Sequence, residues 1–129
     1  MIIIKECPAY FPMDVGISIR RIKGWISTVR GAGIVPIIAT VSPVTEKRDI
    51  ETSGQQVCID RFNEKLVKLA SEEGVPLFDM ASFIRKGAHD THLDEKFADP
   101  DGLHLNAVAY RRLDKELVAF LNCLGTKNK

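Results

Sequence analysis

The chain has 129 residues, of which 45% are hydrophobic and 27% charged, with a formal net charge of +1. This length suits one domain with a substantial core, and the near-neutral charge favours neither nucleic acid nor a membrane surface as the main partner. No apolar run is long enough to span a bilayer, and we expect no signal peptide because Lys5 and Glu6 end the first apolar run. Three widely spaced cysteines favour reduced thiols in the cytoplasm over a disulfide framework. These are Cys7, Cys58 and Cys123.

The chain is expected to open with a strand and then a helix. The continuous β-branched run at residues 2–4 is typical of a strand that is buried on both faces. Two prolines then predict a loop over residues 7–14. A helix is expected over residues 15–30, because apolar side chains recur there at helical spacing with basic side chains on the other side. Its expected inward residues are Ile19, Ile22, Ile26 and Val29, with Trp25 beside them.

The same alternation continues along the chain. A buried strand is expected over residues 34–41, followed by a polar loop over residues 44–56 with room for one helical turn. Apolar residues from 59 to 69 predict a second helix that Gly74 closes, and residues 75–80 predict a third strand.

The C-terminal part is expected to be mostly helical. A short helix is expected over residues 82–85 and a last helix over residues 107–124, which Gly125 ends. The inward residues of the last helix are expected to be Tyr110, Leu113, Leu117, Phe120, Leu121 and Leu124.

This order of elements is typical of right-handed βαβ crossovers and a parallel sheet. It predicts a single α/β domain over residues 1–129 with a three-layer, flavodoxin-like fold whose parallel sheet is reduced to three strands. A strand of three isoleucines belongs in the middle of a sheet, yet residues 2–4 are the first element of the sequence. We therefore expect either that a second chain covers this strand in a homo-oligomer, or that the polypeptide is the C-terminal part of a longer design.

Residues 99–110 carry the strongest chemical signal and read Asp-Pro-Asp-Gly-Leu-His-Leu-Asn-Ala-Val-Ala-Tyr. Asp101 precedes His104 by three residues, Gly102 allows a tight turn between them, and Asn106 is a natural cap for the helix that follows. A carboxylate that orients a histidine is the base half of a nucleophilic triad, although no activated Ser or Cys stands out. The alternative is a structural turn of the Asx type with a capping histidine.

Several blocks of the sequence resemble the C-terminal half of an SGNH (GDSL-type) hydrolase. Residues 33–43 resemble the family's fourth strand and the loop after it, and residues 62–75 resemble its next helix. The tripeptide Phe-Asp-Met at residues 78–80 resembles the following strand. Residues 101–106, Asp-Gly-Leu-His-Leu-Asn, match the last family block, with Ala-Tyr at residues 109–110 after it.

The resemblance implies that Asp101 is the triad acid and His104 the general base of an acyl-ester hydrolase. Such an enzyme acts on a small-molecule ester and needs no cofactor. The family's Gly-Asp-Ser nucleophile block and its oxyanion-hole glycine follow two earlier strands that this sequence lacks. Where the third block normally reads Gly-x-Asn-Asp, residues 5–10 read Lys-Glu-Cys-Pro-Ala-Tyr.

The sequence thus predicts an esterase- or lipase-type hydrolase, or an incomplete piece of one, which need not be active. The alternative from another class is a non-catalytic α/β module that binds a partner or a small molecule.

Four residues near the ends of the expected strands carry weaker signals. Cys7 follows the first expected strand, on the side where α/β folds place their sites, and is either a stand-in nucleophile or a small buried residue, which we favour. Lys5 and Glu6 are expected to form an ion pair. Ser42 is expected to be a turn residue before Pro43, since no base lies near it in the sequence.

The loop before the last helix contains residue types that can bind metals. His89, Asp90 and His92 lie together, with Asp94 and Asp99 nearby. Because the spacing of the two histidines has no helical period, we favour a solvated loop and expect no metal.

Overall fold

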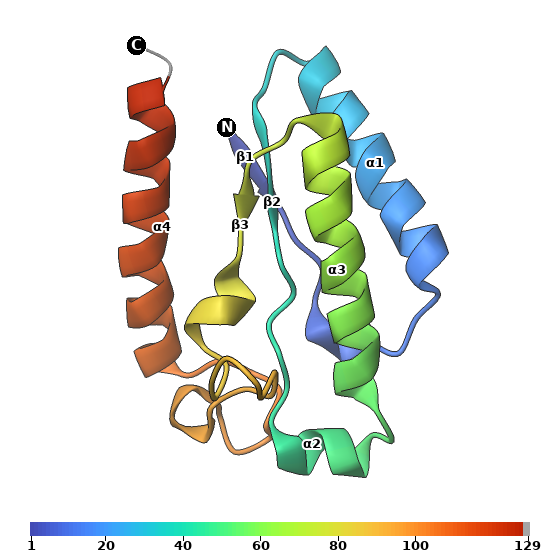
Figure 1. Cartoon of the computed structure of the whole chain (residues 1–129), viewed down its shortest axis with the longest axis vertical. Coiled ribbons are helices and arrows are strands. Elements are labelled where there is room, and N and C mark those ends of the chain that lie inside the picture. The colour runs from blue at the N-terminus through green and yellow to red at the C-terminus, as the bar shows by residue number, and fades with distance from the viewer. Residues whose placement is uncertain (128–129) are drawn as a thin grey trace.

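Three short parallel strands form the central sheet, in the order β1-β2-β3 (Figure 1). In the computed structural model, which describes residues 1–127, β1 spans Ile2–Ile4, β2 spans Pro36–Ala39 and β3 spans Leu77–Phe78. The expected parallel sheet of three strands is therefore confirmed, and β1 lies at one of its edges.

Helices cover both faces of the sheet. Helix α1 (Val15–Gly31) and helix α3 (Gln55–Glu73) pack on one face, and α4 (Ala107–Lys127) packs on the other, as Figure 1 shows. These three layers are the α/β architecture that the alternating sequence pattern predicts. The shorter elements are helix α2 (Glu46–Glu51) and three 3₁₀ helices, η1 (Pro8–Tyr10), η2 (Met80–Phe83) and η3 (Glu95–Phe97).

Two hydrophobic cores hold the layers together. Successive side chains of a strand point to opposite faces, so Ile38 enters the core under α1 and α3 while Ile37 enters the core under α4. Both isoleucines are fully buried, and truncating either to alanine would cost about 2–5 kcal/mol. The central strand is therefore the element that couples the two cores.

Local signals set the ends of the long helices. Asp14 caps α1, because its carboxylate accepts the Ile17 N–H at 2.8 Å. Helix α3 ends at Gly74, which has a φ of +59°, a left-handed conformation that favours glycine. Within α3, the Asn63 side chain bonds both the N–H and the C=O of Val41, at 2.8 and 3.0 Å, and so fixes the chain that leaves β2.

The structure corrects two expectations about burial and one about the end of a helix. Strand β1 is not buried on both faces, because it lies at the sheet edge, where Ile2 is 46% and Ile3 40% exposed. Tyr110 points outward rather than inward, because it directly follows the buried Ala109 on the helix and its side chain is rotated away from the core. Gly125 does not end α4, which runs on to Lys127.

The other expected inward residues of α4 do pack on the second core: Leu113, Leu117, Phe120, Leu121 and Leu124. Within residues 1–127, none of the helices combines the length and the apolar character that crossing a bilayer requires.

Candidate active site

The Asp101 carboxylate and the His104 imidazole contact each other in the turn before α4. Oδ2 of Asp101 lies 2.5 Å from Nδ1 of His104. Oδ1 of the same carboxylate accepts the backbone N–H groups of Leu103 and His104, each at 2.9 Å. The carboxylate is thus held by three hydrogen bonds, and the ring nitrogen that faces away from it, Nε2, is the one available to accept a proton.

These hydrogen bonds keep the carboxylate ionised. The bond from the His104 ring, followed by those from the backbone N–H groups of His104 and Leu103, lowers the pKa of Asp101 from 3.8 to about 2. An ionised carboxylate at this position fixes the ring tautomer and stabilises the imidazolium that forms when His104 takes up a proton. Both side chains are open to solvent, with Asp101 43% and His104 67% exposed.

A glycine allows the turn to lie close against helix α2. Gly102 has a φ of +69°, and a Cβ at this position would collide with Oγ1 of Thr45. The Thr45 N–H donates to the Gly102 carbonyl at 2.9 Å. The start of α2 therefore supports the turn that carries Asp101 and His104.

Asn106 holds the other end of the turn. Its Oδ1 accepts the N–H groups of Val108 and Ala109 at 2.9 and 3.1 Å, which is the expected cap of α4. Its Nδ2 donates to the carbonyls of Lys96 and Ala98 at 2.9 and 3.1 Å. The Asn106 side chain thus joins the start of α4 to η3. His104 therefore lies between two anchored residues, Gly102 and Asn106.

Helix α2 is the part of this site that the sequence reasoning missed. It lies within residues 44–56, which we expected to form a long loop with room for a helical turn. The sequence signal that could have predicted this helix is its N-terminal cap, not a periodic pattern of apolar residues. Thr45 accepts the Arg48 N–H at 3.3 Å, and the acidic residues Glu46 and Asp49 lie in the first turn.

Neither Cys7 nor Ser42 is joined to His104 by a hydrogen bond in the part of the chain that the structure describes. Cys7 is half-buried after β1, at the start of η1. Ser42 is buried after β2, before Pro43. The structure thus pairs the expected acid with the expected base and does not pair the base with a nucleophile from residues 1–127.

An ion pair forms at Glu6, as expected, but Lys5 is not its partner. Glu6 is buried and pairs instead with Arg21 of α1 at 2.7 Å, while Lys5 is exposed. Successive residues of an extended segment point to opposite sides, so Lys5 and Glu6 cannot both face the helix.

Two of the candidate metal ligands, Asp90 and His92, contact each other, but they do not form a metal site with a third. Among residues 1–127, no group of three or more His, Cys, Asp or Glu side chains is placed to hold a metal ion. His92 lies between the carboxylates of Asp90 and Asp49, whereas His89 is exposed.

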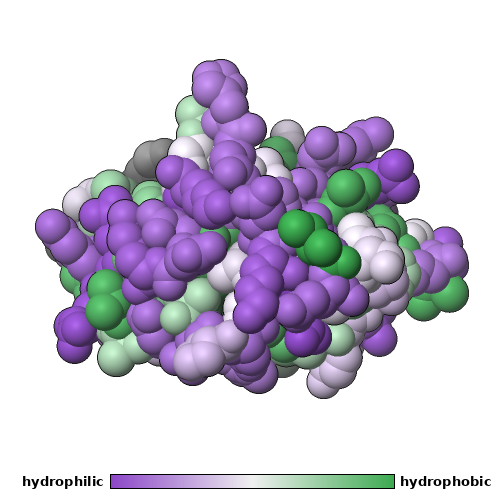
Figure 2. All heavy atoms as spheres, turned by 90° about the horizontal axis from the view of Figure 1, so that it is seen from below, coloured by the Kyte–Doolittle hydropathy of each residue, from purple (hydrophilic) through white to green (hydrophobic). Residues whose placement is uncertain are grey.

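The surface around Asp101 is shallow. The hollow beside it measures about 130 Å³ and is lined by Thr45, Arg48, Pro100 and Gly102, among others. Pockets for drug-sized ligands measure about 300–1,000 Å³. Figure 2 looks onto this end of the molecule and shows a mostly hydrophilic surface with scattered hydrophobic residues. The described residues therefore do not enclose an acyl chain next to this pair.

Solved structures share this fold although their sequences are distant. No protein-family model matches the sequence, and no curated protein sequence matches it. A protein named as a lipolytic member of the G-D-S-L family from Desulfitobacterium hafniense DCB-2 superposes with a TM-score of 0.74 and 19% identity. The match covers 92% of this chain and 63% of that one. The fold is GDSL-like.

Two further solved structures agree. A GDSL-like lipase from Bacteroides thetaiotaomicron VPI-5482 has a TM-score of 0.74 at 15% identity, over 87% of this chain and 55% of its own. A protein named as an acylhydrolase from Bacteroides fragilis NCTC 9343 has a TM-score of 0.71 at 16% identity. This match covers 85% of the present chain and 52% of that one. The chain therefore spans between about half and two thirds of the length of these structures, which supports the suspected SGNH/GDSL relationship at the level of fold.

Proposed function

We propose that this chain supplies the acid–base half of an acyl-ester hydrolase. The observation that carries the proposal is the contact between Asp101 and His104, on a fold shared with lipolytic and acylhydrolase proteins. A short turn before a helix could place a carboxylate beside a histidine for structural reasons alone, so the fold and the contact are needed together.

In this reaction Nε2 of His104 accepts the proton of the attacking hydroxyl, whose oxygen bonds to the ester carbonyl carbon. The same nitrogen then gives the proton to the leaving alcohol as the ester C–O bond breaks. Asp101 stays ionised because its pKa is about 2, and it holds the Nδ1–H toward itself throughout. The chemistry needs no metal ion or cofactor.

We propose further that this half is incomplete without other residues. The nucleophile, a serine by resemblance, and the donors that stabilise the oxyanion would come from protein beyond residues 1–127. The shallow surface beside Asp101 and the coverage of 52–63% of the solved structures support this view. The chain would then correspond to the C-terminal portion of such a domain.

The partner and setting of the chain are part of the proposal. Where no earlier strand of a longer domain pairs with β1, exposed Ile2 and Ile3 at its open edge favour a homo-oligomer that covers this strand. Three free cysteines, Cys7, Cys58 and Cys123, favour the reducing cytoplasm.

A gain-of-function fusion tests the catalytic proposal. The segment of the Desulfitobacterium structure that has no counterpart here is joined to this chain, and p-nitrophenyl acetate hydrolysis is measured. We expect the fusion to hydrolyse the ester and His104→Gln to abolish the activity. His89→Gln, which changes an exposed histidine, is the matched control and should have no effect. A folded fusion without His104-dependent activity would favour the non-catalytic binding module instead.

A further inference from the structure

The imidazole of His92 lies between two carboxylates from different parts of the fold. Its Nδ1 is 2.8 Å from Oδ1 of Asp90 in the same loop, and its Nε2 is 3.2 Å from Oδ2 of Asp49 on α2. The other oxygen of Asp49 accepts the Gln56 N–H at 2.7 Å, which fixes that carboxylate. The His92 side chain is 24% exposed and that of Asp49 19%. One ring therefore connects the loop to a helix.

Both contacts can form together only if the ring carries two protons. An ionised carboxylate accepts hydrogen bonds and cannot donate them, and a neutral imidazole has a single N–H. A neutral ring would donate to one carboxylate and turn its lone pair toward the other. The imidazolium donates to both, so the observed arrangement suits the charged ring.

The charges around the ring favour the same form. Asp60 of α3 accepts the Thr91 hydroxyl at 2.8 Å. Glu46 of α2 pairs with Lys86 of the loop at 3.1 Å. The charges that act on the ring itself are those of Asp90 and Asp49, and both favour the imidazolium.

The pKa values follow from these contacts. Burial lowers the pKa of His92, but the hydrogen bonds to Asp49 and Asp90 outweigh burial, and the net result is a raised pKa. The pKa of Asp90 is lowered, first by the hydrogen bond from the His92 backbone N–H and then by that from its ring. Because the His92 pKa is raised on folding, its stabilising contribution is complete below the ordinary histidine pKa and is lost as the pH rises through the raised value.

Polar contacts attach residues 86–92 to the helices, whereas the residue after them is anchored in the core. Leu93 is fully buried and its N–H donates to the Val44 carbonyl at 2.8 Å. Within the segment, Lys86 N–H donates to the His92 carbonyl at 2.9 Å, which closes the loop on itself. Losing the His92–Asp49 contact would therefore loosen the segment without disturbing Leu93.

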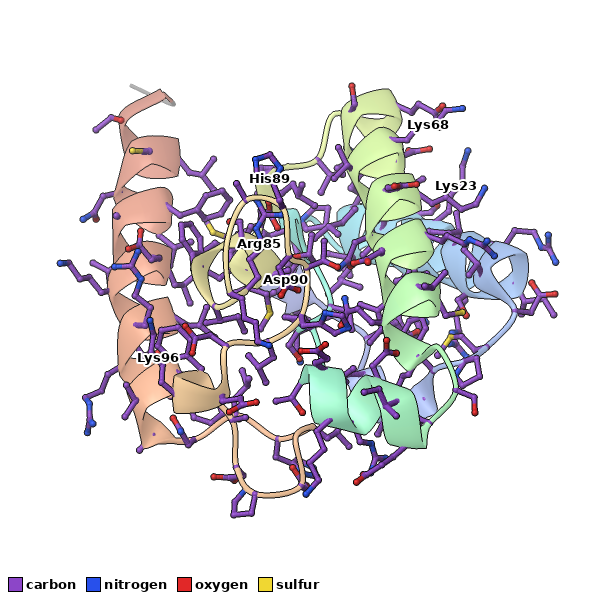
Figure 3. The ribbon with its side chains drawn as sticks, turned by 60° about the horizontal axis from the view of Figure 1, so that its bottom comes forward. Lys23, Lys68, Arg85, His89, Asp90 and Lys96 are labelled. Atoms are coloured by element: carbon purple, nitrogen blue, oxygen red, sulfur yellow. The ribbon has the colours of Figure 1, made fainter. Side chains whose placement is uncertain are left out.

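The loop also borders a hollow at the carboxyl ends of two strands. This polar hollow measures about 320 Å³ and is lined by Thr40 after β2, Asp79 after β3, Asp60 of α3, Arg85 just before the loop and Thr91 within it, among others. Figure 3 shows Arg85, His89 and Asp90 on the loop, which lies between α4 and α3 in that view. Movement of residues 86–92 would change access to the hollow.

We propose that residues 86–92 form a pH-dependent flap beside this polar hollow, closed onto α2 while His92 is charged and released when His92 loses its proton. The contact to Asp90, at 2.8 Å, is shorter than that to Asp49, at 3.2 Å, so the neutral ring keeps its N–H toward Asp90 and Nε2 no longer holds a proton toward Asp49. The side-chain contacts that still join the loop to the helices are then Thr91–Asp60 and Lys86–Glu46.

An NMR pH titration of the ¹⁵N-labelled chain tests this flap. The ring resonances of His92 report its titration, and amide exchange with water, corrected for its intrinsic pH dependence, reports opening. We expect the amides of Lys86 and His92 to exchange about fivefold faster above the ring titration than below it. The amide of Leu93, bonded to Val44, should stay protected throughout.

Two variants separate the contact from general effects of pH. Asp49→Asn should move the His92 titration and the exchange step together to lower pH, because it removes the negative charge at Nε2. His89→Gln, an exposed histidine of the same loop, should leave both unchanged. The proposal is wrong if exchange shows no step across the His92 titration, or if the step stays in place in Asp49→Asn. If Asp49→Asn does not fold, the wild-type titration alone decides.

Discussion

Gly102 and Thr45 are in direct contact, with the Gly102 carbonyl accepting the Thr45 N–H at 2.9 Å and the Thr45 hydroxyl filling the space of a Cβ. The two residues belong to segments that are distant in sequence. One lies between Asp101 and His104, and the other caps α2. The position of Asp101 and His104 thus depends on helix α2, which no apolar pattern in the sequence predicts.

Gly102→Ala should therefore destabilise the protein. The new Cβ meets Thr45, and the φ of +69° costs an L-residue about 1–2 kcal/mol before any collision. We expect a fall in Tm of at least about 4 °C in a thermal unfolding experiment.

Gly24→Ala is the matched control for this substitution. Gly24 lies within α1, and a Cβ there meets nothing within 4 Å. Alanine is a better helix former than glycine by about 1 kcal/mol, so the Tm should stay or rise. Equal losses of Tm in both variants would contradict the role assigned to the Gly102–Thr45 contact.

Asp101 should make stability depend on pH in the acid range. Its pKa falls from 3.8 to about 2 on folding, so its contribution is present above the unfolded-state pKa and is lost as the pH falls toward the folded-state value. Since the side chain is 43% exposed, solvent screening reduces this contribution to about 1 kcal/mol. Between pH 5 and pH 2, urea unfolding should show that the wild type loses about this much more stability than Asp101→Asn. Parallel losses would show that the contact does not favour the ionised form.

The sequence predicted those features of the structure that depend on residues close together in the chain. The three strands and three long helices follow from runs and periods of apolar residues, and the Asp101–His104 contact spans one turn. The cap by Asn106 is equally local. For these features, neighbouring residues in the sequence determine the geometry.

Contacts between distant segments escaped the sequence reasoning. Glu6 pairs with Arg21 rather than with its neighbour, and the His92–Asp49 contact joins a loop to helix α2, in a segment that was expected to be mostly loop. Polar pairing partners of this kind depend on how elements pack, which a pattern of residue types does not encode. The predicted inward orientation of Tyr110 was wrong for a related reason. Neighbouring residues of a helix point in different directions, so Ala109 faces the core while Tyr110 faces solvent.

The isolated chain should hydrolyse p-nitrophenyl acetate at a near-background rate, and His104→Ala should not change that rate. The members of a triad act as a unit, so an acid and a base without a nucleophile and oxyanion donors retain little of its effect. A strong wild-type rate that His104→Ala abolishes would show instead that the chain is complete. Cys7→Ser would then be the first variant to examine, with a loss of orders of magnitude expected if Cys7 is the nucleophile.

The open edge of β1 should cause self-association. Ile2 and Ile3 are 46% and 40% exposed, and a groove of about 300 Å³ beside them is lined by Trp25 and Val29 of α1, among others. Sedimentation at micromolar concentration should detect a dimer or larger assembly, and Ile3→Lys should shift it to monomer, because a charged side chain at a strand edge opposes pairing. Val118→Lys, at a 58% exposed valine of α4, is the control and should leave the assembly intact. A wild-type chain that sediments as a monomer would show that no second copy covers this strand.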